Sequence, residues 1–166
     1  FEMSVGKERL IVNMGSAPAG EAEWRHLQRA SAAHSGLIVA DTNSVALRRG
    51  GGFGHVSGTA TSRREDQDGA ALADARHDFY ARRFGLAHRR RLYLATGGED
   101  LRGEDTLDGT AGRAYAIRFH LHPEVRASLL QGGGALLRLP GGGGWRMRAD
   151  GAAIALADSI YFGHGG

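Results

Sequence analysis

The sequence lacks cysteine altogether, which excludes disulfide bonds and thiolate metal sites. It also lacks any apolar run near the roughly 20 residues that a membrane-spanning helix requires, so no membrane span is expected. The first ten residues do not combine a charged segment with a following apolar one, which is the pattern of a signal peptide. Thiol chemistry and insertion of a helix into a membrane are therefore not among the functions that the sequence suggests.

Lysine is almost absent as well, because Lys7 is the only lysine among 21 basic residues and the others are arginine. With 18 acidic residues, the formal net charge is +3. Two explanations stay open: the base composition of the genome, or recognition of anions by guanidinium groups, which match carboxylate and sulfate groups. No nucleic acid is expected as a partner, since such a protein would need a denser basic patch interleaved with aromatic residues.

Glycine, in contrast, is abundant at 27 of 166 residues, and its clumps separate short apolar or alternating runs. Glycine tolerates positive φ angles and marks turns, so the runs between the clumps predict strands. Residues 90–95 and 115–122 alternate with a period of two, which is typical of half-buried antiparallel strands. We therefore predict an all-β, antiparallel β-sandwich (supersandwich-like) in a single domain over residues 1–166. The expected strands cover residues 1–5, 9–14, 36–40, 44–48, 70–75, 80–85, 88–95, 101–107, 114–122, 135–139, 145–149, 152–156 and 159–162.

Two segments depart from the strand pattern. Residues 21–33 are rich in helix formers and do not alternate, so we expect at most one short helix there, or a loop that crosses a sheet. Residues 122–131 are either one helical turn or a turn into a strand, and we favour the strand.

Six short motifs carry a resemblance to a known family, through their order and spacing more than through any one of them. Together they resemble the C-terminal β-sandwich region of heparinase II/III-like polysaccharide lyases, and more narrowly the uncharacterised bacterial members. The motifs are Phe-Glu-Met-Ser (1–4), Leu-Ile-Val-Asn-x-Gly (10–15), Arg-Ala-Ser-Ala-Ala-His-Ser (29–35), His-Asp-Phe-Tyr (77–80), His-Arg-Arg-x-Leu (88–92) and Phe-His-Leu-His-Pro (119–123).

The resemblance implies a function for the whole parent protein. In the family, a helical toroid precedes the sandwich, and an acidic, uronate-containing polysaccharide is cleaved by β-elimination in the cleft between them. The sandwich would form one wall of that cleft, with the upstream helical domain as its partner and the periplasm as its location. Most of the family's proton-transfer groups lie upstream of the matching region, so we expect this chain alone to be inactive. The alternative is a non-catalytic carbohydrate-binding or interaction module, and an open first strand at residues 1–5 would also allow edge-to-edge dimers.

The resemblance also implies a metal site, with zinc as the ion. The family-equivalent positions are Asn13 and His34, and His34 is in addition a weak candidate for catalysis. An amide is a poor zinc ligand, since zinc prefers imidazole, thiolate or carboxylate, so we expect no cofactor here. The structural alternative for His34 is a hydrogen bond to the backbone at the entrance of a strand.

Four residues are candidates for binding the substrate: His77, Tyr80, His88 and Arg90. Tyrosine beside histidine suggests acid–base chemistry, and arginine suggests contacts with sugar carboxylates. The alternatives are packing of the sandwich for the first two and a salt-bridged face for the last two. Acidic residues within 98–109 could supply the partners of the arginines.

Other polar residues favour structural roles. His120 and His122 are two residues apart in an expected strand and could share a metal, but without an evident third ligand we favour a polar outer face. Asp41 and Asn43 are typical of turns.

Overall fold

The computed structural model describes residues 1–17, 20–49, 52–110 and 112–163. Every strand pair with a defined register is antiparallel, and the helices are short. The prediction of an all-β, antiparallel fold is therefore confirmed, in keeping with the β-sandwich class. The chain divides into two compact units: Phe1–Gly36 together with Ile117–Gly166 (unit 1), and Leu37–Ala116 (unit 2).

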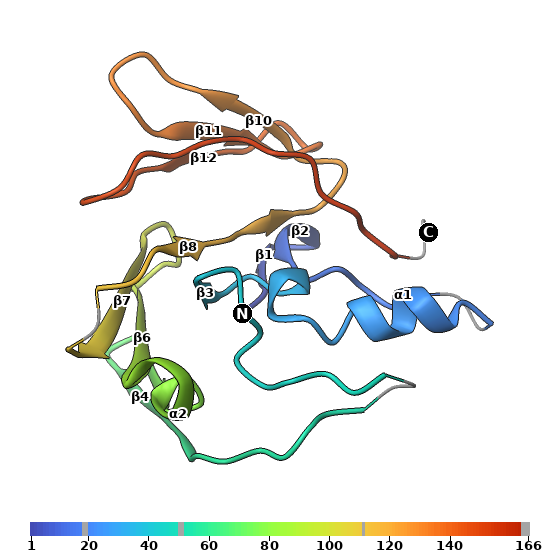
Figure 1. Cartoon of the computed structure of the whole chain (residues 1–166). Coiled ribbons are helices and arrows are strands. Elements are labelled where there is room, and N and C mark those ends of the chain that lie inside the picture. The colour runs from blue at the N-terminus through green and yellow to red at the C-terminus, as the bar shows by residue number, and fades with distance from the viewer. Residues whose placement is uncertain (18–19, 50–51, 111, 164–166) are drawn as a thin grey trace. The chain divides into compact units, whose positions relative to one another are not determined.

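Unit 1 contains two three-stranded sheets (Figure 1). In the first sheet the strand order is β1-β2-β9, and in the second it is β10-β11-β12. The tight glycine-containing connections between neighbouring strands agree with the turns that the sequence predicted. The strands are β1 (Met3–Val5), β2 (Glu8–Val12), β9 (His120–Leu121), β10 (Arg126–Leu129), β11 (Ala135–Arg138) and β12 (Gly144–Met147).

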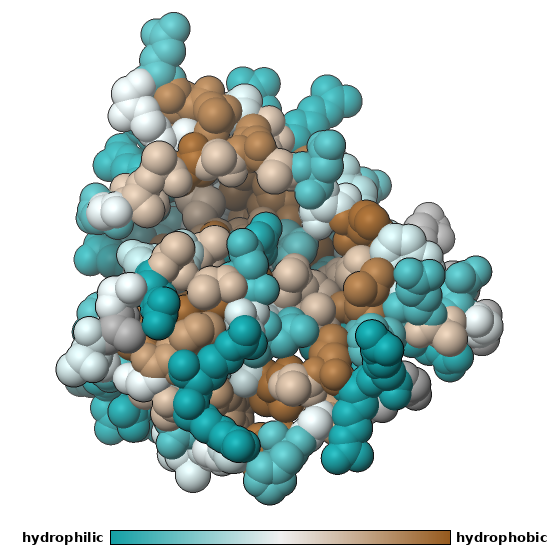
Figure 2. Space-filling view, viewed as in Figure 1, coloured by the Kyte–Doolittle hydropathy of each residue, from teal (hydrophilic) through white to brown (hydrophobic). Residues whose placement is uncertain are grey.

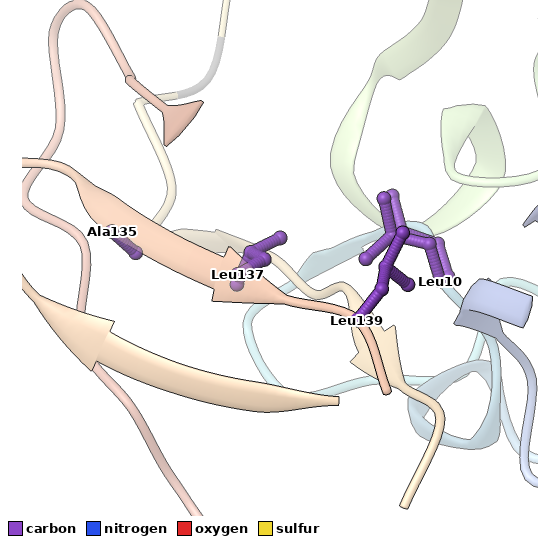
Figure 3. Close-up of a cluster of buried hydrophobic side chains, with 5 residues drawn as sticks. Leu10, Ala135, Leu137 and Leu139 are labelled. Atoms are coloured by element: carbon purple, nitrogen blue, oxygen red, sulfur yellow. The ribbon is translucent and has the colours of Figure 1, made fainter. Parts of the chain in front are cut away.

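The core of unit 1 joins β2 to the sheet of β10, β11 and β12. Leu10 from β2 lies against Leu137 and Leu139 in a cluster that also includes Ile11 and Ala135 (Figure 3). The side chains of Leu10 and Leu139 point toward each other in this view. Burial of such leucine side chains stabilises a fold by about 1.5–3 kcal/mol each. One face of the β10–β12 sheet is therefore fixed inward.

The helix expected within residues 21–33 is present as α1 (Ala22–Leu27), followed by a single 3-10 turn at Ser31–Ala33. The side-chain amide of Gln28 donates a hydrogen bond of 2.7 Å to the carbonyl of Gly15 and so ties this segment to the chain after β2. The favoured prediction for residues 122–131, a turn into a strand, is also confirmed, because β10 lies there.

Unit 2 is built on a four-stranded sheet with the order β4-β5-β6-β7. A separate pair is formed by β3 and β8, and a single helical turn, α2, connects β5 to β6. Leu37, Val39, Tyr80 and Leu86 form its buried cluster. The elements are β3 (Leu37–Val39), β4 (Ala60–Gln67), β5 (Ala70–His77), α2 (Ala81–Phe84), β6 (Leu86–Leu94), β7 (Leu101–Gly109) and β8 (Tyr115–Ile117).

Several expected strands were wrong. Within residues 80–85, Ala81–Phe84 form α2, which is followed by Gly85 in the left-handed conformation (φ 67°), a common way to terminate a helix. The expected strand 114–122 is interrupted between β8 and β9, so His120 and His122 do not share one continuous strand. The segments 44–48, 152–156 and 159–162 contain only isolated bridges or irregular backbone.

One strand was not expected at all. All eight residues of β4 are exposed, so its sequence carries no alternation between apolar and polar residues. It is an edge strand, and charged side chains on such a strand discourage pairing with other chains. None of the helices within the described ranges is long and apolar enough to cross a membrane.

The turn after β3 confirms the structural reading of Asp41. Thr42 donates its backbone N–H to the carbonyl of Val39 at 3.0 Å, which closes a two-residue turn. Both central residues, Ala40 and Asp41, have φ near 48°, as a hairpin turn that matches the twist of the strands requires.

Candidate functional site

The register of the four-stranded sheet gathers polar residues on one face of unit 2. His77 lies opposite His88, and Arg90 lies opposite Asp105. Directly opposed residues, and residues two apart on one strand, point to the same side of a sheet. His77, His88, Arg90 and Asp105 therefore share one face, and three of the four were predicted as candidates from the sequence.

The four side chains form a continuous hydrogen-bonded chain. Nε2 of His88 lies 2.6 Å from Oδ1 of Asp105, and its Nδ1 lies 3.3 Å from Nε2 of His77. Nδ1 of His77 in turn accepts the backbone N–H of Phe79 at 3.4 Å. One consistent assignment lets each Nε2–H donate along the chain toward Asp105. Arg90 completes the group by donating from Nε and from a terminal nitrogen to the two oxygens of Asp105, at 2.8 and 2.9 Å.

Burial and charge set the electrostatics of this cluster. Burial lowers the pKa of His77 to about 4, and the neighbouring His88 acts in the same direction. Burial would raise the pKa of Asp105, but its hydrogen bonds from His88 and Arg90 outweigh that effect and lower it. The cluster thus holds a carboxylate clamped by a guanidinium, next to an imidazole that resists protonation.

Tyr80 lies against this cluster without offering its hydroxyl to solvent. It is 1% exposed, its ring centroid is 5.8 Å from that of His77, and its hydroxyl donates to the carbonyl of Thr42 at 3.3 Å. Because His88 is only 7% exposed as well, two of the four candidate substrate-binding residues are parts of the interior. For Tyr80 this geometry supports the packing role that the sequence left open, and for His88 the contact with Asp105 supports the salt-bridged alternative.

The opposite face of the same sheet carries a ladder of ion pairs whose arginines are partly exposed. Asp74 binds Arg89 through two hydrogen bonds of 2.9 and 2.6 Å, and Arg91 pairs with Glu104. The guanidinium of Arg89 lowers the pKa of Asp74. The predicted acidic segment 98–109 supplies Glu104 to this face. Its Asp105 pairs with His88 and Arg90 on the first face, which is the salt-bridged alternative that the sequence left open for those two residues.

Unit 1 contains the family-equivalent metal positions, Asn13 and His34. The side-chain nitrogen of Asn13 donates to Glu2 at 3.0 Å, and its oxygen accepts the backbone N–H of Ser35 at 2.9 Å. Both ends of the amide are thus engaged in structural hydrogen bonds, which do not fit a zinc ligand. His34 ends the 3-10 turn, and the protein atoms around its exposed ring displace enough water to lower its pKa, while a hydrogen bond to the backbone of Gln28 acts in the opposite direction.

Ser35, which the sequence did not single out, connects the elements around His34. Its buried hydroxyl donates to the carbonyl of Val12 at 2.7 Å and accepts the backbone N–H of His120 at 2.9 Å. Within the described ranges, no three histidine, aspartate or glutamate side chains are grouped as ligands of an ion. Next to His34, the Ser35 side chain therefore links the backbone of β2 to that of β9.

The side chain of His120 closes one wall of a small pocket in unit 1. Its Nε2 lies 2.8 Å from the carbonyl of Ala32, and its Nδ1 lies 2.7 Å from the hydroxyl of Ser159. The pocket, of about 150 Å³, is also lined by Asn13 and Tyr161. Ser159 could not have been found from the sequence, because an irregular segment brings it to a histidine 39 residues away.

Known proteins give this geometry a context. No solved structure is significantly similar to the chain. Among curated proteins, the chain is similar to FtsZ-localized protein C of Caulobacter vibrioides (strain NA1000 / CB15N), with 38% identity over 184 aligned residues. The match covers 99% of this chain but 31% of the relative, so the chain spans about a third of that protein's length. The family described as heparinase II/III-like, C-terminal, matches residues 1–166, and the chain belongs to this family.

Proposed function

We propose that this chain is a non-catalytic interaction module built on the C-terminal fold of the heparinase II/III-like family. The observation that carries the proposal is the closure of Tyr80 and His88, two of its candidate proton-transfer groups. The hydroxyl of Tyr80 is bound to the carbonyl of Thr42, and both ring nitrogens of His88 are occupied by His77 and Asp105. A base in β-elimination must reach the proton next to the uronate carboxylate, which a buried and fully bonded side chain cannot do.

The name of the curated relative supports the same direction. FtsZ-localized protein C is named for where it is found, not for a polysaccharide that it degrades. We propose that the full chain, with any further residues that its gene encodes, likewise accumulates where FtsZ is located. In that role the family fold supplies a rigid surface for contacts with other molecules.

A second candidate function is the wall of a lyase cleft, which the family match over residues 1–166 favours. Under this alternative, an upstream helical domain supplies the missing proton-transfer groups, and the substrate is an acidic polysaccharide in the periplasm. Exposed arginines of the module would then contact the carboxylates of the sugar.

The experiment that separates the two candidates is an elimination assay on the full chain. Heparan sulfate, alginate and other uronate polymers are incubated with the protein, and the ultraviolet absorbance of the unsaturated product is followed beside a known heparinase. We expect no increase above the no-enzyme control. A fluorescent fusion imaged together with FtsZ should give coincident signals.

Two results would count against the module. A rise in absorbance that is lost in a Tyr80→Phe variant would establish a lyase and place Tyr80 in its chemistry. Fluorescence spread evenly through the cell would remove the proposed link to FtsZ.

A further inference from the structure

The outer face of the β10–β11–β12 sheet is covered by arginines. Arg126 on β10 lies directly opposite Arg138 on β11, and Leu136 on β11 lies opposite Arg146 on β12. Residues 126, 138 and 146 alternate with the inward-facing positions of their strands, so they share one side of the sheet. All three arginines are exposed, as is Arg148 just after β12. We call these four residues the arginine face.

The other side of this sheet fixes which way the arginine face points. Ala135 and Leu137 are buried in the core of unit 1, and Trp145 and Met147 pack against the same core. Since neighbours along a strand point to opposite sides, the arginines between them must point to solvent. In Figure 2, the upper part of the view, where Figure 1 places β10, β11 and β12, shows hydrophobic side chains with hydrophilic ones projecting around them.

The arginine face has no acidic partner among the residues that the structure describes. In the part of the chain that the structure describes, no carboxylate lies within salt-bridge distance of Arg126, Arg138 or Arg146. Arg126 and Arg138 lie directly opposite each other. Like charges in this position destabilise a strand pair. Arginines that form no ion pair within the described part of the fold are available for contacts with another molecule.

We propose that the arginine face is a docking surface for an acidic polypeptide segment. The inference rests on the proposed function as an interaction module and names the chemistry of the partner. Carboxylates on alternate residues of an extended segment are spaced about 7 Å apart, which matches the two-residue separation of Arg146 and Arg148. Guanidinium groups bind carboxylates through paired hydrogen bonds, so the segment is held by charge and by geometry together.

The strand edge next to the arginine face favours a polypeptide over other polyanions. Among the described strands, β12 pairs with β11 alone, so its other edge offers backbone N–H and C=O groups to an added strand. The outward-facing positions of the three strands carry no aromatic ring, because Trp145 is on the inner side. Single-stranded nucleic acids bind by stacking on such rings, and a sugar ring stacks on them in the same manner. A peptide needs neither.

The test measures binding of a labelled twelve-residue peptide of alternating glutamate and threonine to the full chain by fluorescence anisotropy. The peptide should bind, and its affinity should fall with added salt because exposed charges are screened. The triple variant Arg126→Gln, Arg138→Gln, Arg146→Gln should weaken binding about tenfold or more, since it removes three contacts. An alternating glutamine–threonine peptide should not bind.

A matched control uses three exposed arginines that already have acidic partners. The pairs are Arg63 with Glu65, Arg64 with Asp66, and Arg102 with Asp100. Replacing these three arginines by glutamine changes the net charge by the same amount as the first triple variant does. This variant should bind the peptide like the unchanged protein. Thermal unfolding of both variants checks that they fold.

Three outcomes would overturn the docking surface. Equal loss in the two triple variants would reduce the effect to general attraction. Absence of peptide binding would exclude acidic polypeptides as the partner. Tighter binding of another polyanion through the same arginines would assign the surface to that polyanion. The polyanions tested are heparin, oligo(dT) and vesicles with phosphatidylglycerol. A lyase signal with intact peptide binding would defeat the proposed function alone.

Discussion

In the sheet of unit 2, Arg90 lies opposite Asp105 and Arg91 lies opposite Glu104, whereas in the outer sheet of unit 1 Arg126 lies opposite Arg138. The first arrangement uses each cation to hold neighbouring strands together. The second leaves the cations facing solvent and repelling each other. The same residue type thus serves the fold in one sheet and is available to a partner in the other. The nearest carboxylate decides which, because Arg89 of unit 2 lies opposite Arg76 and is still paired with Asp74.

The largest expected effect on stability comes from removing the carboxylate of the buried ion pairs in unit 2. An Asp105→Asn variant leaves His88 and Arg90, whose side chains are 9% and 12% exposed, without their carboxylate. Removing one partner of a buried ion pair costs about 3–5 kcal/mol, because the remaining charge stays desolvated. Denaturation of the full chain by urea should show this loss.

The matched control for Asp105 lies on the other face of the same sheet. An Asp74→Asn variant removes the partner of Arg89, whose side chain is 41% exposed and can be solvated by water instead. The loss of stability should be clearly smaller than for Asp105→Asn. Equal losses would mean that burial does not distinguish the two faces.

A second expected effect concerns acid. Because the pKa of folded His77 is about 4 and that of an unfolded histidine is about 6.5, the unfolded state binds an extra proton between these values. Stability is therefore full above pH 6.5 and falls as the pH drops toward 4, by up to about 2 kcal/mol after allowance for solvent screening. A His77→Gln variant should lose much of this slope in urea denaturation at several pH values.

The control for His77 is His55, an exposed histidine of the same unit. A His55→Gln variant should keep the slope of the unchanged protein between pH 6.5 and 4. If both variants behave alike, the acid sensitivity arises elsewhere, for instance at His34, whose pKa is also lowered.

The smallest expected effect is a change in stability whose sign should differ between the two sheets. An Arg138→Gln variant removes the repulsion with Arg126 and should raise stability by about 0.2–0.5 kcal/mol at low salt. An Arg89→Gln variant should lower stability, because Asp74 loses its partner. High salt should shrink both differences. A loss of stability in Arg138→Gln would show that the arginine face has internal partners after all.

Much of the fold could be predicted from local patterns. Alternation located β6, and the glycine clump at 97–98 located the turn between β6 and β7. The second alternating stretch, 115–122, is divided between β8 and β9. Prediction of strands and helices failed where burial leaves no periodic pattern in the sequence. β4 is exposed on both sides and therefore reads as a polar loop, while Ala81–Phe84 forms a helical turn in a stretch too short to show helical periodicity.

The candidate site was predictable only in part. His77, His88 and Arg90 were selected by residue type, but the chain of hydrogen bonds that ends at Asp105 depends on the register of three strands. The closure of Tyr80 depends on Thr42, which is 38 residues away. The partner of each polar group is a long-range contact, and single-sequence periodicity carries no information about it.

The sequence by itself determined the fold class, the family and the scarcity of lysine, because these follow from composition, period and motif order. Tertiary structure alone decided which arginines are neutralised and which are exposed, and which histidines are sealed. The reason is that electrostatic free energy depends on the distance between charges and on the water around them. Cross-strand register and core packing set both quantities, and neither can be read along the chain.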